Sequence, residues 1–78
     1  MRKIEELLKE LHAENNYTES SDLIADGLLD SFDLIRLIAL LESEYGVRVA
    51  GTDLVPMNFQ SLAAIRKLLA GYGVEGEL

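Results

Sequence analysis

Apolar residues recur at helical spacing in three stretches of this chain. In the first stretch, Ile4, Leu7, Leu8 and Leu11 fall on one face of a helix, and charged residues stand between them. This pattern predicts an amphipathic helix of about three turns. The polar pair at positions 15–16 is expected to end it.

Residues 13–30 show no sustained helical period and are rich in Asn, Ser, Thr, Glu and Asp. A loop of this length in so small a domain is usually functional or disordered. It also contains two apolar pairs, Leu23-Ile24 and Leu28-Leu29. These pairs indicate that the loop is held against the core.

The clearest predicted element is a helix from Ser31 to Tyr45, ended by Gly46. Asp30 and Ser31 are both candidates for its N-cap, because either side chain can accept a hydrogen bond from the free N–H groups of the first turn. Asp33 in that turn suits the positive end of the helix dipole.

This second helix is apolar on two sides. One stripe consists of Leu34, Leu37, Ile38, Leu41 and Tyr45. The other consists of Phe32, Ile35 and Ala39. A surface helix normally shows a single apolar stripe. We therefore expect the second stripe to be partly exposed and to meet another surface.

The remaining pattern predicts a turn of helix at 52–55, stopped by Pro56, and a last helix from about Ser61 to Leu69. We expect an all-α fold, a small four-helix bundle with three main helices, a short third helix and a long first loop. Residues 1–70 are expected to form the single domain, and residues 71–78 a disordered tail.

The charge of the chain is unevenly distributed. The net charge is −7, and residues 13–45 contain eight acids and one base, Arg36. Such a field repels nucleic acid and anionic membranes and steers basic protein surfaces toward this region. Acidity that only keeps a small domain in solution is the simpler explanation.

The composition also excludes several classes of site. The chain has no Cys, so disulfides, thiolate metal sites and a cysteine nucleophile are excluded. No apolar stretch resembles a signal peptide or is long enough to span a bilayer. We expect a soluble monomer that does not insert into membranes.

A calcium loop is a rival motif for the acidic loop. Asp22, Asp26, Gly27 and Asp33 fall at the first, fifth, sixth and twelfth positions of an EF-hand-like frame. However, Ile24 stands at the third position, and the twelfth lacks the bidentate Glu of such loops. We therefore favour no metal site here.

His12 is the only histidine, so a cluster of histidine ligands is excluded. We expect it to be a surface residue or to interact with the C-terminus of the first helix. A dyad of Ser31 and His12 would need a third group and an oxyanion site, and neither is evident. No glycine-rich phosphate loop is present either. We expect no enzymatic activity.

Ser31 is the residue with the most specific candidate chemistry. A serine directly before an apolar helix is typically an N-cap. The same position suits a covalently attached phosphate, because free N–H groups and the positive end of the dipole lie there. Spacing alone favours the cap.

The residues around Ser31 resemble a known family. Segment 22–33 is similar to the attachment-site region of acyl and peptidyl carrier proteins, whose signature is an Asp-Ser pair followed by a bulky apolar residue. Here that signature is Asp30-Ser31-Phe32. Segments 41–47 and 58–65 also resemble this family, and the resemblance covers residues 2–70.

The resemblance implies a cytoplasmic carrier protein. Ser31 would carry 4′-phosphopantetheine, donated from coenzyme A by a phosphopantetheinyl transferase. Asp30 would help the transferase or its Mg²⁺ to engage the site. The arm would supply the thiol that this chain lacks, and it would present an acyl or amino-acid group as a thioester to loading and downstream enzymes.

The resemblance also places partner contacts on the second helix. The residues concerned are Phe32, Asp33, Ile35, Arg36 and Ala39. Packing of the apolar ones under the long loop is the alternative. Arg36 makes this helix less acidic than in fatty-acid carriers, and segment 27–32 is closer to D-alanyl carrier proteins and stand-alone peptidyl carriers, whereas Asp33 follows the fatty-acid pattern. The cargo therefore stays open among fatty acyl, polyketide, amino acid and D-alanine.

A second hypothesis needs no prosthetic group. In it, the chain is a non-covalent acidic interaction module, and Ser31 only caps the helix. Replacing Ser31 would then cost about 1 kcal/mol of stability and leave binding intact.

Overall fold

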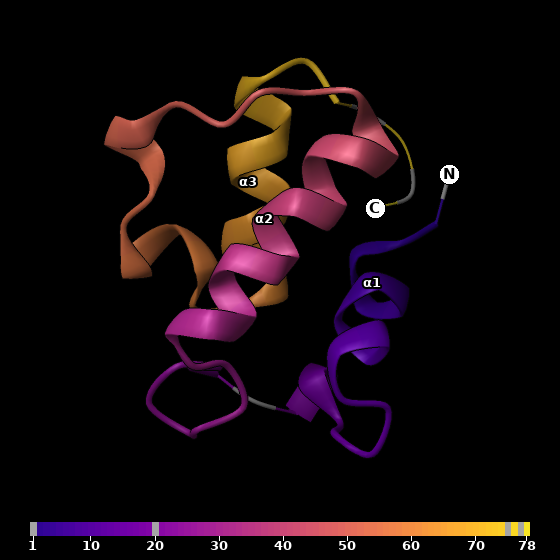
Figure 1. Cartoon of the computed structure of the whole chain (residues 1–78), viewed down its shortest axis with the longest axis vertical. Coiled ribbons are helices and arrows are strands. Elements are labelled where there is room, and N and C mark those ends of the chain that lie inside the picture. Colours follow the sequence, from indigo (N-terminus) through magenta and orange to yellow (C-terminus); the bar gives the residue numbers. More distant parts are fainter. Residues whose placement is uncertain (1, 20, 75, 77) are drawn as a thin grey trace.

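The computed structural model describes residues 2–19, 21–74, 76 and 78. Within these residues the secondary structure is all helical, as predicted. The α-helices are α1 (Ile4–Leu11), α2 (Ser31–Tyr45) and α3 (Leu62–Gly71). Short 3₁₀ segments are η1 (Tyr17–Glu19), η2 (Gly51–Asp53) and η3 (Pro56–Phe59). Helix α1 packs against both α2 and α3, and α2 crosses in front of α3 in the view of Figure 1.

The core is built from the apolar faces that the spacing predicts. Each α-helix contributes fully buried leucine or isoleucine side chains to this core, together with Tyr17 and Phe59; the helical ones are Ile4, Leu7, Leu8, Leu37, Leu41, Ile65 and Leu69. The long loop joins this core through Leu23 and Leu29, and Ile24 and Leu28 pack at its edge. The prediction that the apolar pairs hold the loop against the core is therefore confirmed. Its turn closes through Gly27, whose φ of +76° is accessible to glycine without strain.

Helix α1 is shorter than predicted. It ends at Leu11, and His12 takes an extended backbone conformation at its C-cap, so the helix does not reach residues 15–16. The limits of α2 match the prediction, including the left-handed Gly46 at its C-cap. Ser61 caps α3, because its Oγ accepts a hydrogen bond from the N–H of Ala64 at 3.1 Å.

The predicted short helix at 52–55 is replaced by η2 and η3 in the described chain. Pro56 begins η3, and Val55 before it is extended, with φ −120° and ψ 147°. A residue that precedes proline is disfavoured in the α conformation, so the segment divides at this point. The described residues thus hold three α-helices, and 3₁₀ turns take the place of the fourth.

The C-terminal segment contains contacts that the expected tail did not include. Gly71 completes α3, Val74 is buried, and the N–H of Ile4 donates to the carbonyl of Leu78 at 2.6 Å. Positions 75 and 77 lie outside the described residues. The domain boundary at residue 70 stays a prediction.

Candidate functional site

The N-terminus of α2 is capped by Asp30. Its Oδ1 accepts a hydrogen bond from the N–H of Asp33 at 2.8 Å, and Oδ2 of Asp33 accepts one from the N–H of Asp30 at 3.2 Å. This reciprocal pair is a capping box, in which an aspartate stands where Glu or Gln is usual. Of the two cap candidates, the structure selects Asp30.

Ser31 is therefore the first residue of the helix and has no capping role. The residue is exposed, and no group within the described residues forms a hydrogen bond with its hydroxyl. The N–H groups of Ser31 and Phe32 also have no acceptor within this part of the chain, as expected for the first turn of a helix. The site thus offers a free hydroxyl beside two free backbone donors.

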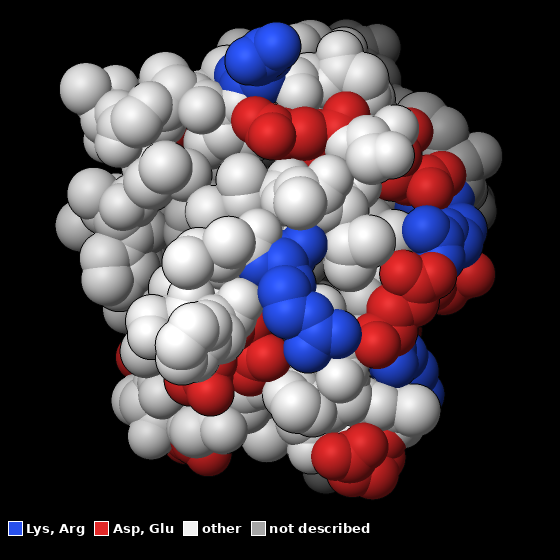
Figure 2. Space-filling model, in the orientation of Figure 1, with Lys and Arg blue, Asp and Glu red and all other residues white. Residues whose placement is uncertain are grey.

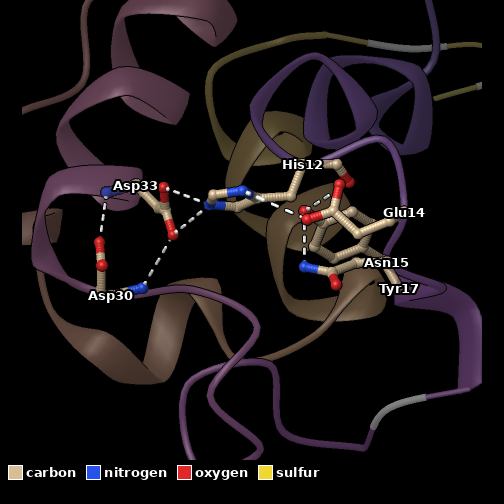
Figure 3. A network of polar contacts seen from close by, with 6 residues as sticks. All are labelled: His12, Glu14, Asn15, Tyr17, Asp30 and Asp33. Atoms are coloured by element: carbon tan, nitrogen blue, oxygen red, sulfur yellow. Dashed lines mark hydrogen bonds and ion pairs between the residues drawn. The ribbon is translucent and has the colours of Figure 1, made fainter.

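A polar network links this end of α2 to the end of α1 (Figure 3). Nε2 of His12 lies 3.0 Å and 3.1 Å from the two carboxylate oxygens of Asp33. A carboxylate only accepts, so the ring donates its proton through Nε2. Asp33 is 6% exposed and bridges the C-terminal cap of α1 to the N-terminal cap of α2. His12 Nδ1 faces Glu14 Oε1 at 3.8 Å.

The sequence gives no sign of this network. From the sequence, His12 is expected at the surface or near the end of α1, and the family resemblance places Asp33 on the partner-binding face. His12 does lie at that helix end, but it contacts an aspartate 21 positions away. The pairing has no signal in local spacing, because it depends on how α1 and α2 pack.

The second apolar stripe of α2 faces outward. Phe32 is 76% exposed and Ile35 is 67% exposed, and Arg36 and Ala39 are exposed beside them. Packing under the loop therefore does not account for Phe32. The predicted partner-binding residues thus separate into an exposed group of four and Asp33, which is buried.

An apolar groove of about 310 Å³ runs beside Ser31, between α2 and the segment that contains η2 and η3. It is lined by Ser31, Leu34, Ile35, Ile38, Leu54, Val55, Pro56 and Phe59. Leu54, Val55 and Met57 of the same segment are exposed. In Figure 2 the side of the molecule that bears this segment is largely uncharged, whereas acidic and basic residues gather over α1.

The far wall of the groove is held by Tyr72, the residue that follows α3. The Tyr72 hydroxyl donates to Oδ2 of Asp53 at 2.5 Å and accepts from the N–H of Ala50 at 2.8 Å. The hydrogen bond to Asp53 is the main reason that the pKa of Tyr72 lies above its ordinary value. These contacts fix η2 to the end of α3 and so position Leu54 and Val55.

Residues 2–69 match the family model described as the phosphopantetheine attachment site. This match spans most of the 78 residues. The chain belongs to this family. No curated protein and no solved structure matches it in the other two comparisons. Carrier proteins of this family hold a covalent 4′-phosphopantetheine group, are not themselves catalytic, and interact with a phosphopantetheinyl transferase and biosynthetic enzymes.

The residues of this carrier protein fit such a group. A phosphodiester requires a free hydroxyl and favours nearby N–H donors at a helix N-terminus. Ser31 and the N–H groups of the first turn of α2 provide both. The adjoining groove is open to the surface and predominantly apolar in its lining residues.

In the carrier protein, the first and last aspartates of the EF-hand-like frame, Asp22 and Asp33, form hydrogen bonds within the domain. Oδ1 of Asp22 accepts hydrogen bonds from the N–H groups of Ile24 and Ala25 and so closes a turn. Asp33 faces His12 instead of the loop interior. The two ends of the frame are therefore occupied by structural contacts.

Among the described residues, no helix is both long and apolar enough to cross a membrane.

Proposed function

We propose that Ser31 is the residue that carries 4′-phosphopantetheine, and that the arm holds an acyl or aminoacyl group as a thioester. One observation supports this assignment above the others. Asp30 caps α2, which leaves the Ser31 hydroxyl exposed and without a hydrogen-bond partner in the described chain. A serine needed only as a cap would be engaged with its own helix.

The attachment step is a phosphoryl transfer from coenzyme A. The Ser31 oxygen forms a bond to the phosphorus next to the pantetheine, the pyrophosphate bond of coenzyme A breaks, and adenosine 3′,5′-bisphosphate leaves. The proton of the hydroxyl passes to a base of the transferase. The N–H groups of Ser31 and Phe32 then lie beside the anionic phosphodiester and favour it. When bound, the arm supplies the thiol that this cysteine-free chain lacks.

Asp30 is proposed to have a dual role. Oδ1 already fixes the first turn by accepting from Asp33 N–H. The residue itself is exposed and precedes Ser31 directly, so it is accessible to the transferase and its Mg²⁺. We propose a cytoplasmic location, where coenzyme A is available as the donor.

Partner enzymes are proposed to dock on the exposed face of α2. Phe32, Ile35, Arg36 and Ala39 form this docking surface, which adjoins Ser31 and the groove. Asp33 is excluded from it because it is buried between His12 and Asp30. Its role is to hold the attachment site in place.

The cargo is proposed as an acyl or aminoacyl group, since the same thioester holds either. The sequence around Ser31 is similar to D-alanyl and stand-alone peptidyl carriers, and Arg36 and the exposed Phe32 fit that similarity better than a fatty-acid carrier. An aminoacyl cargo is the choice that these residues favour.

The test is an intact mass measurement after incubation with coenzyme A, Mg²⁺ and a broad-specificity phosphopantetheinyl transferase. We expect one phosphopantetheine adduct on the native chain and none on Ser31→Ala. Ser43→Ala is the matched control, because Ser43 is an exposed serine on the same helix. It should be modified like the native chain.

The same variants distinguish the carrier from a non-covalent module. Ser31→Ala should change the free energy of unfolding by no more than about 0.5 kcal/mol, because no cap is lost. Asp30→Ala should cost about 1 kcal/mol. A folded native chain that acquires no adduct would refute the attachment at Ser31.

A further inference from the structure

Helix α2 contains three acids, Asp33, Glu42 and Glu44, in addition to Arg36. Each of the three accepts a hydrogen bond from another part of the domain. Asp33 is buried against His12. Oε2 of Glu42 accepts from the N–H of Val49 at 2.9 Å. The carboxylate of Glu44 accepts hydrogen bonds from the backbone N–H of Arg2 at 2.8 Å and from Nε of Arg2 at 3.1 Å. These hydrogen bonds lower the pKa of Glu44.

Arg36 is the charged residue of α2 without such a contact. It is exposed, and within the described residues it forms no ion pair or hydrogen bond. It stands one helical turn after Phe32 and follows Ile35, so its guanidinium belongs to the same exposed side of the helix. Glu10 lines a hollow with Arg36 between α1 and α2, but Glu10 pairs with Arg2.

The local charge of the docking surface is therefore opposite to the net charge of the molecule. The chain as a whole carries −7, yet the docking surface of Phe32, Ile35, Arg36 and Ala39 presents apolar side chains and one cation, and Asp30 is the exposed acid directly before Ser31. Long-range attraction to basic surfaces depends on the whole field. Contact energy depends on the groups that meet, and a lysine or arginine placed against Arg36 would be repelled.

We propose that the enzyme that docks at Ser31 presents an apolar recess to Phe32 and Ile35 and a carboxylate to Arg36. This inference rests on the proposed function and specifies the partner for the same site. A guanidinium binds a carboxylate through two parallel hydrogen bonds, which adds orientation as well as attraction. Such a contact one turn from Phe32 would fix the rotation of α2 against the enzyme and aim Ser31 at its active site.

The experiment is steady-state kinetics of phosphopantetheine transfer with the broad-specificity transferase as the probe, varying the carrier and coenzyme A separately. Arg36→Glu is compared with Arg66→Glu. Both change the net charge from −7 to −9, but Arg66 lies on α3 and lines hollows that do not include Ser31. Circular dichroism confirms that each variant is folded.

We expect Arg36→Glu to raise the KM for the carrier about tenfold with kcat little changed, and Arg36→Lys to recover part of the loss. Arg66→Glu should stay within about twofold of the native KM. Phe32→Ala should also raise the KM for the carrier, because the apolar anchor is removed.

Three results would overturn the proposal. A lower KM for Arg36→Glu would mean a basic partner surface. Equal effects of Arg36→Glu and Arg66→Glu would mean that only net charge matters. A raised KM for coenzyme A alone would mean that Arg36 binds the phosphates of the donor. Each of these results is measurable only if the native chain accepts phosphopantetheine. If the native chain is not modified at all, it is the proposed attachment at Ser31 that fails.

Discussion

Helices α1 and α2 have similar numbers of apolar residues per turn but use them differently. All four apolar residues of α1 are buried, and its polar residues face outward. Helix α2 buries Leu37 and Leu41 completely but exposes Phe32 and Ile35. Buried side chains of this kind stabilise the fold, whereas large exposed apolar side chains beside the exposed Ser31 contribute little to it and are available for binding.

The largest change in stability is expected for a buried residue of α2, compared with an exposed residue of the same helix. Leu37→Ala should lower the free energy of unfolding by about 3 kcal/mol, because it leaves a cavity at a fully buried position. Ile35→Ala, two residues away, should lower it by no more than about 0.5 kcal/mol. Urea denaturation monitored by circular dichroism measures both. Equal losses for the two variants would mean that the Ile35 side chain is packed, and the docking surface would lose its basis.

An intermediate effect is expected at the polar end of α2. Asp33→Ala should cost about 2 kcal/mol, because it removes the acceptor for the N–H of Asp30 and for His12 Nε2 at a buried position. Asp33→Asn preserves the shape and should cost less.

A double-mutant cycle with His12→Ala measures the pairing directly. We expect a coupling of about 1 kcal/mol between His12 and Asp33, since the two residues are in contact. Additive effects of the two substitutions would show that the His12–Asp33 contact does not support the attachment site.

The smallest effect is expected from alkaline pH. Burial raises the pKa values of Tyr17 and Tyr45, and the hydrogen bond to Asp53 raises that of Tyr72, all above the ordinary 10.0. The folded state thus binds protons more tightly than the unfolded state. The tyrosine contribution to stability is complete below pH 10 and is lost as the pH rises through the higher folded values.

Thermal denaturation between pH 8 and pH 11.5 checks this sign. The Tm should be flat with respect to tyrosine ionisation up to about pH 10 and fall above it. Tyr17→Phe should make the fall less steep, because its buried hydroxyl no longer ionises. An equally steep fall in this variant would assign the alkaline loss to other groups.

Much of the fold could be predicted because its signals are local. Apolar spacing placed α1, α2 and α3, Gly46 ended α2, and Ser61 capped α3. One error has a local cause, because Pro56 divided a segment that was expected to be one short helix. The other does not: α1 ends at Leu11, and His12 beyond it is extended and contacts Asp33, a residue 21 positions away.

The candidate site was predicted less completely than the fold. Ser31 and its motif were evident, and the family model confirms the class of protein. Two cap candidates stood side by side, however, and only the hydrogen bond from Asp33 to Asp30 showed that Ser31 is free of that role. Asp33 was placed on the partner face by the resemblance to the family, although tertiary contacts bury it.

The sequence by itself determined the helical class, the limits of α2 and the position of a candidate attachment serine. Each follows from residues that are neighbours along the chain, through helical periodicity and capping. Only the tertiary structure decided that Asp33 and His12 meet, and that the acids of α2 form contacts within the domain while Arg36 forms none among the described residues. These features depend on which elements pack together, and pairing between residues far apart in the sequence leaves no periodic trace in the chain.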